Sequence, residues 1–151
     1  MMRNNRALND LKLLLKNDIN DTIKSVEINE DIYGQHYVCL IGPKDTPFEG
    51  GIFKIGFTLP NDYPYKPPKM FFVTKVYHPN ISRDGGICID ILKDQWSAAM
   101  RLNTVFLSLS SLLANPNPND PLVPEIANEY KMDKNKYNMN VIAYVKKYAM
   151  I

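Results

Sequence analysis

The chain has 151 residues, of which 45% are hydrophobic and 23% charged, and its formal net charge is +2. This length and composition fit one folded domain over residues 1–151 and are unlike those of disordered or fibrous proteins. The small positive charge is too weak to predict nucleic-acid binding, and no apolar run is long enough to predict a transmembrane helix.

The first predicted element is an amphipathic helix over residues 3–16. Four of its leucines follow a helical pattern, and we expect them to pack inward: Leu8, Leu11, Leu14 and Leu15. The polar stretch 18–22 then ends the pattern.

Four strands are predicted next, over residues 25–28, 37–41, 52–59 and 69–76. The third has the clearest pattern, because aromatic and aliphatic side chains alternate with smaller or polar ones, which is typical of a strand. Glycine and proline residues interrupt the chain between the segments. The links are short, which favours an antiparallel meander.

A central helix is predicted to begin near Asn103, a good N-cap, and to end before Pro116. Its inward face is apolar and consists of Val105, Phe106, Leu109, Leu112 and Leu113. Two C-terminal helices follow, because Pro124 suits a first helical turn and Asp133 can cap the last helix. Early strands and late helices predict an α+β fold, with the central helix packed on a four-stranded sheet.

One of the two cysteines stands in an unusual context. Cys88 lies eight positions beyond a His-Pro-Asn triplet at 78–80, and residues 83–86 before it are polar and contain glycine. We therefore expect an accessible thiol, and a thiolate is a strong nucleophile whose thioester remains reactive toward amines. A buried structural thiol is the alternative, and it is the one that we favour for Cys39 in its apolar strand.

Cysteine usage also bears on the compartment. Two cysteines cannot form a disulfide framework, and residues 1–5 lead into no apolar stretch typical of a signal peptide. We therefore expect a protein of the cytoplasm and nucleus, without membrane association.

Three features together resemble the active-site signature of ubiquitin-conjugating enzymes: the segment 77–92, Trp96 and the proline-rich segment 115–124. The resemblance covers nearly the whole chain and is closest to the short, core-domain-only members that work with many ligases. It implies that Cys88 accepts ubiquitin from the activating enzyme as a thioester. Ubiquitin then passes to lysine amines of substrates or of ubiquitin, with a RING or HECT ligase. It implies no metal ion or organic cofactor, and we expect a monomer.

Other functions stay open beside this one. The runs 91–97 and 148–150 also resemble members that build lysine-63 chains with a cysteine-less partner, and the modifier could be a relative of ubiquitin. A non-catalytic ubiquitin-binding variant of the fold is the rival from another functional class. Such variants lack the cysteine that stands here at position 88.

The two histidines are not expected to act as bases. A cysteine hydrolase needs a base near its thiol, usually a histidine. The resemblance instead implies a loop-stabilising hydrogen bond for His78, and we interpret His36 as an edge residue before an apolar strand.

Three polar residues match further positions of the family's active site. Asn80 matches the asparagine whose amide stabilises the oxyanion, with bracing of its own loop as the structural alternative, and we favour a mixture of the two roles. Asp90 and Asp120 match acidic positions of the lysine-receiving site. Asp120 would orient the lysine there while desolvation lowers the lysine pKa, and capping of its own loop is the alternative.

Contact surfaces are also implied by the resemblance. The positions that engage the activating enzyme and ligases are matched by Arg6, Pro64, Tyr65, Ser97, Ala98 and Ala99. Leu107 and Ser108 match positions that hold the donor ubiquitin, and Ser25 matches a site for a second ubiquitin on the opposite face. Ala98 replaces the usual proline of a Ser-Pro-Ala triplet, which loosens φ in that loop and leaves the range of ligases open.

Overall fold

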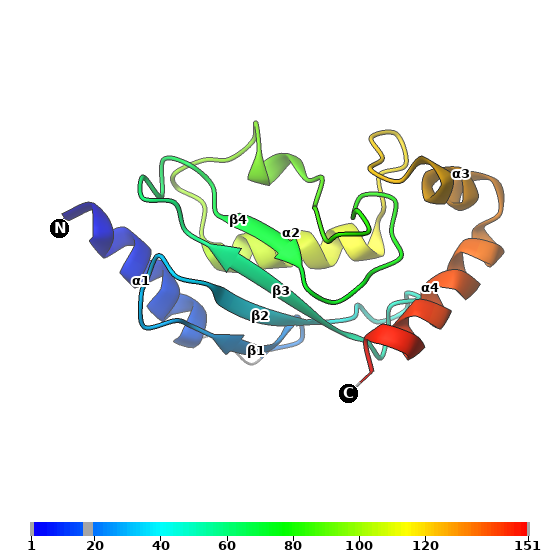
Figure 1. The fold of residues 1–151 in the computed structure, drawn as a ribbon, viewed down its shortest axis with the longest axis horizontal. Helices are drawn as coiled ribbons and strands as arrows, with labels where there is room; N and C mark the ends of the chain where they lie inside the picture. The colour runs from blue at the N-terminus through cyan, green and yellow to red at the C-terminus, as the bar shows by residue number, and fades with distance from the viewer. Residues whose placement is uncertain (1, 17–19, 151) are drawn as a thin grey trace.

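The structure is a computed structural model that describes residues 2–16 and 20–150, so part of the predicted 18–22 connection lies outside the described residues. Its elements, shown in Figure 1, are α1 (Met2–Lys16), β1 (Ile23–Glu27), β2 (His36–Ile41), β3 (Ile52–Thr58), β4 (Lys69–Phe72), a short 3₁₀ helix η1 (Asp90–Leu92), α2 (Leu102–Ala114), α3 (Pro124–Met132) and α4 (Lys134–Tyr148). This order confirms the α+β class.

The strands form one antiparallel sheet in the order β1-β2-β3-β4, which confirms the meander. The fourth strand is shorter than predicted and ends at Phe72. Beyond it the backbone leaves the ladder, because the N–H groups of Val73 and Thr74 both donate to the carbonyl of Lys54, at 2.8 and 3.3 Å.

Helix α2 crosses one face of the sheet, while α1 lies at one end of it and α3 with α4 at the other (Figure 1). The predicted cap was wrong: Asn103 lies inside the helix and Arg101 is the N-cap. The carbonyl of Arg101 accepts from the N–H groups of Thr104 and Val105, so backbone bonding sets this start. The predicted end before Pro116 is confirmed, since α2 stops at Ala114.

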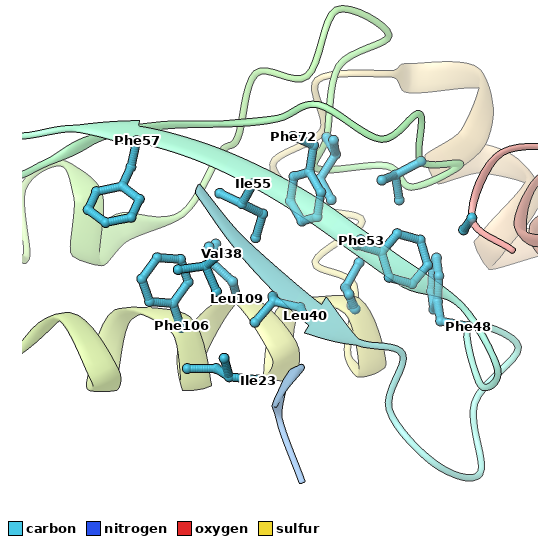
Figure 2. Close-up of a cluster of buried hydrophobic side chains, with 14 of the residues drawn as sticks. Ile23, Val38, Leu40, Phe48, Phe53, Ile55, Phe57, Phe72, Phe106 and Leu109 are labelled. Carbon is cyan, nitrogen blue, oxygen red and sulfur yellow. The ribbon is translucent and has the colours of Figure 1, made fainter. Parts of the chain in front are cut away.

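The main core lies between α2 and the sheet (Figure 2). Phe106 of α2 meets Phe57 of β3 edge to face, with ring centroids 5.5 Å apart. The buried side chains that α2 contributes are Leu102, Val105, Phe106, Leu109 and Leu113, whereas Leu112 is only half-buried. Their burial stabilises the fold by roughly 10 kcal/mol before conformational entropy is counted. The first and last turns of α2 are thereby held firmly against the sheet.

The inward face of α1 differs from the predicted one. Leu11 and Leu14 are buried, but Leu8 is 38% and Leu15 42% exposed. These two lie further round the helix than the face that Leu11 and Leu14 define, and four leucines cover too wide an arc to be buried together. The buried face instead includes a carboxylate, that of Asp10.

The last two helices begin as predicted. Pro124 occupies the first turn of α3, and the side chain of Asp133 caps α4 by accepting from the N–H of Lys136 at 3.1 Å. Within the described ranges, no helix combines the length and the apolar character needed to cross a membrane.

Candidate active site

His78 ties the active-site segment to α2. The ring is buried, its Nδ1 accepts from the N–H of Asn80 at 2.9 Å, and its Nε2 donates to the carbonyl of Leu112 at 2.7 Å. Burial lowers the pKa of His78 to about 4, so the ring is neutral at physiological pH. The predicted loop-stabilising hydrogen bond is confirmed.

His36 is buried as well, so its interpretation as an edge residue was wrong. Its Nδ1 accepts from the N–H of Asn29 at 2.9 Å, and its Nε2 lies 2.9 Å from the carbonyl of Ile32. The ring closes the turn before β2. Because both histidine rings bond to backbone groups, their observed roles are structural.

Asn80 joins the Cys88 segment to the loop that carries Asp120. Its amide donates to the carbonyls of Asn117 and Asp120, at 2.8 and 3.0 Å, and its side-chain oxygen accepts from the N–H of Asn117 at 2.7 Å. Its backbone carbonyl accepts from the N–H of Cys88 at 2.9 Å. The amide thus braces the loop over residues 117–120 and not its own loop, as the structural alternative had it, while the oxyanion role stays a prediction.

The loop before Cys88 is fixed on β4 by a glycine. Gly85 has a φ of 96°, and a Cβ added there would lie 2.2 Å from the carbonyl oxygen of Phe72. The same close approach lets the N–H of Phe72 donate to the carbonyl of Gly85 at 2.9 Å. Since only glycine combines this φ with this contact, the residue holds the loop in register with the sheet.

The thiol of Cys88 lies between two side chains of opposite charge. It is half-buried, its S–H donates to Oδ2 of Asp120 at 3.5 Å, and Nζ of Lys93 lies 3.7 Å from Sγ. Burial and the Asp120 carboxylate raise the pKa of the Cys88 thiol, and the Lys93 ammonium opposes them. The protonated thiol is thus favoured at neutral pH, and its nucleophilic form gains as pH rises.

We expect the alkylation rate of Cys88 to report these opposing charges. Asp120→Asn removes the anion and should shift the rate-against-pH curve toward lower pH, whereas Lys93→Gln should shift it toward higher pH. Iodoacetamide labelling in a Cys39→Ser background, followed by mass spectrometry, measures both curves. An Asp120→Asn curve that coincides with that of the parent would contradict the expectation.

The acidic residues occupy two different positions. Asp120 is exposed beside the thiol, and Asp90 is exposed at the start of η1. The carbonyl of Asp90 accepts from the N–H groups of Lys93 and Gln95, both at 2.9 Å, and so fixes the turn after Cys88. Among the described residues, no three His, Cys, Asp or Glu side chains are grouped so as to hold a metal ion.

A second polar cluster lies beneath the predicted docking surface. Asp10 is 2% exposed and accepts from Nε of Arg6 at 2.8 Å, from the hydroxyl of Tyr63 at 2.6 Å and from Nη1 of Arg101 at 2.9 Å. Arg6 also donates to the carbonyl of Met100 at 2.9 Å. One carboxylate thus connects α1, the loop before β4 and the segment before α2.

This cluster brings the predicted docking residues to one end of the molecule. The indole of Trp96 donates to the carbonyl of Pro64 at 2.9 Å, and its ring centroid lies 6.0 Å from that of Tyr63. Tyr65 is 78% exposed, whereas Pro64 itself is buried. Ser97 and Ala99 are exposed and Ala98 is half-buried in the adjoining loop. Tyr65 and this loop therefore present the accessible part of that surface.

The other predicted contact residues lie on α2 and β1, and Ser108 borders the same surface hollow as Asp90. Leu107 is 57% exposed on α2, next to the half-buried Ser108. Ser25 is exposed on β1, where it pairs with Cys39 of β2. Cys39 is half-buried and is therefore less enclosed than the structural interpretation implied.

Two residues of these sites were missed from the sequence. Asp10 could have been noticed as an acidic residue between Ala7, Leu11 and Leu14 on the apolar face, four positions after Arg6. Lys93 gave no comparable signal, because a lysine in a polar turn is ordinarily solvated. Its approach to the sulfur depends on η1, which reverses the chain after Cys88.

Comparisons with known proteins agree with this geometry. The family model for ubiquitin-conjugating enzymes matches residues 6–145. Among solved structures, the E2 domain of a Toxoplasma gondii ubiquitin conjugating enzyme is similar, with 37% sequence identity and a TM-score of 0.87. That match covers 97% of this chain and 98% of the other. The chain therefore belongs to the ubiquitin-conjugating enzyme family.

Proposed function

We propose that this chain accepts ubiquitin from the activating enzyme as a thioester on Cys88. It then transfers ubiquitin to lysine amines of substrates or of ubiquitin, with a RING or HECT ligase. The observation that carries the proposal is the position of the Cys88 sulfur. It is half-buried, it lies 3.5 Å from the Asp120 carboxylate, and the N–H of Cys88 donates to the carbonyl of Asn80 at 2.9 Å.

The surroundings of the sulfur suit a carrier better than a hydrolase. A hydrolase needs a base to activate water or the thiol, and both histidine rings are occupied by backbone partners. A carrier needs an incoming amine to be oriented, and we assign that role to the exposed carboxylate of Asp120. Transfer then forms an amide from a thioester, a downhill step for which the protein supplies mainly positioning.

The surface formed by Tyr65 and the loop over residues 97–99 supports the same proposal. The exposed Tyr65 and the loop over residues 97–99 adjoin each other through the bond between Trp96 and Pro64. We assign this surface to the activating enzyme and to ligases, with Arg6 holding it in shape through Asp10. Leu107 and Ser108 would then contact the donor ubiquitin, and Ser25 a second ubiquitin.

A charging assay tests the proposal. With ubiquitin, activating enzyme and ATP, we expect an adduct of the chain with one ubiquitin that disappears when reductant is added to the gel sample. Cys88→Ser should give an adduct that resists reductant, because an oxyester replaces the thioester. Cys39→Ser is the matched control and should charge like the parent. The same adduct in Cys88→Ala would overturn the assignment.

The same assay distinguishes the alternatives. Charging by the activating enzyme of a ubiquitin relative, without charging by that of ubiquitin, would identify another modifier. Free chains that form only when a cysteine-less partner is added would identify the lysine-63 chain-building subfamily. We expect charging with ubiquitin and discharge without such a partner.

A further inference from the structure

A cavity lies between the chain that follows β4 and the last two helices, and the proposed function does not use it. Its volume is about 210 Å³. One wall consists of tyrosine rings in contact, because the ring centroid of Tyr144 lies 5.2 Å from those of both Tyr77 and Tyr148. The rest of the inner lining is aliphatic, and these side chains are at most 8% exposed: Val76, Ile81 and Ile126.

Two cations stand at the mouth of this cavity. Lys75 and Arg83 line it, and both are exposed. Glu125 lies 3.5 Å from Arg83, but the two side chains are 68% and 63% exposed, and a weak surface pair of this kind can give way to a phosphate. Glu129 is already engaged, since it accepts from the hydroxyl of Tyr77 at 2.6 Å. The mouth therefore favours an anion.

A second hollow meets the cavity at the same two cations. It has a volume of about 230 Å³ and also borders on Lys75 and Arg83. Thr74 and Ser82 add hydroxyl groups to its lining, and the carboxylate of Asp84 there accepts from the Ser82 hydroxyl. The space that continues past the cations leaves room for a bulky anion on the side away from the tyrosine rings.

The order of these groups decides which kind of anion fits. The inner lining is apolar and the cations are exposed, so a ligand has to enter ring first and leave its charge at the mouth. A phosphotyrosine of a partner protein would enter phosphate first and bring its charge against Ile81 and Ile126, at a large cost in desolvation. A nucleotide has the opposite order, because its base is the free end. Roughly 150 Å³ is enough to hold benzene, so this cavity has room for a nucleobase.

We propose that this cavity binds a nucleoside 5′-monophosphate, with the base against the rings of Tyr144 and Tyr148 and the phosphate between Lys75 and Arg83. A planar base gains contact with aromatic rings whatever its identity. The Arg83 guanidinium can hold two phosphate oxygens at once, and the Lys75 ammonium adds a point charge. The inference concerns the uncharged chain and does not depend on a thioester at Cys88.

Titration calorimetry on the full, uncharged chain tests the assignment, with AMP and UMP as the probes. We expect at least one of them to bind at one site per chain. The matching nucleoside and inorganic phosphate should each bind at least about tenfold more weakly, because each offers only part of the ligand. In two-dimensional NMR of the labelled chain, the nucleotide should cause its largest amide shifts within residues 75–83 and 144–148.

Two variants make the test specific. Arg83→Gln removes the guanidinium and Tyr148→Leu removes a ring while keeping an apolar side chain, and each should weaken nucleotide binding at least about fivefold. Lys69→Gln is the matched control, since Lys69 is an exposed lysine of β4 outside both hollows, and it should bind like the parent. Circular dichroism checks that each variant is folded. Arg83 is exposed, so its replacement tests the site even if Tyr148→Leu does not fold.

Several results would overturn the proposal. One is that neither nucleotide binds, and another is that inorganic phosphate binds as tightly as the nucleotide, which would indicate only a basic surface. Unchanged affinity in Arg83→Gln, or amide shifts centred elsewhere, would mean that the nucleotide binds at another place. Tighter binding of a phosphotyrosine peptide than of either nucleotide would assign the cavity to a protein partner instead. None of these results bears on charging of Cys88, so the proposed function is tested separately.

Discussion

Replacing Asn80 by alanine is expected to slow ubiquitin transfer from Cys88 to free lysine by about a hundredfold, the cost typical of losing one well-placed polar group. The change removes three hydrogen bonds, two to carbonyls of the loop over residues 117–120 and one from the N–H of Asn117. That loop carries Asp120, so the carboxylate loses its position at the thiol. Single-turnover discharge of the preformed thioester into free lysine measures the effect.

Controls separate a brace from a direct contact with the oxyanion. Asn117→Ala keeps the backbone groups that Asn80 binds and should discharge at nearly the parent rate. In a double-mutant cycle, Asn80→Ala with Asp120→Ala should be no slower than the slower single variant if Asn80 acts by positioning Asp120. Losses that multiply would instead show that the Asn80 amide has a catalytic role of its own.

Asp10→Ala is expected to lower the free energy of unfolding by about 3 kcal/mol, because it leaves the groups paired with a buried carboxylate without an acceptor. The hydroxyl of Tyr63 suffers most, since that residue is 1% exposed. Side chains of Arg6 and Arg101 are 25% and 52% exposed and can hydrate in part. Guanidinium denaturation followed by circular dichroism measures the change.

Two other substitutions serve as controls for the stability change expected of Asp10→Ala. Asn9→Ala, on the exposed side of α1, gives a similar gain in helix propensity and should change stability by less than about 0.5 kcal/mol. Tyr63→Phe removes a single hydrogen bond and should cost about 1 kcal/mol. A loss below about 1 kcal/mol for Asp10→Ala would mean that the cluster behaves like an exposed ion pair.

The fold could be predicted from the sequence because its signals are local. Alternation of side chains identified β3, and prolines at 116 and 124 marked the end of α2 and the start of α3. The errors arose where contacts distant in sequence decide. Arg101 caps α2 through its backbone while its side chain is bound by Asp10 of α1, and His36 is buried by a turn that closes over its ring.

The residues of the candidate site also divide into those with a local signal in the sequence and those that only the folded chain brings together. Cys88 could be singled out from its polar, glycine-containing context, whereas Asn80 was found through the resemblance. Asp120 reaches the thiol from 32 residues away and was found through the resemblance. Asp10 unites groups from residues 6, 63 and 101, a convergence that no linear pattern contains.

Trp96 is the single tryptophan of the chain, and it lies where the two loops proposed for docking meet. Its indole donates to the carbonyl of Pro64 and lies close to the Tyr63 ring. A protein that binds Tyr65 and the neighbouring loop therefore changes the polarity around the indole. The intrinsic fluorescence of Trp96 is therefore expected to report complex formation in the unlabelled chain. Affinities at this end can be titrated directly, without attaching a dye.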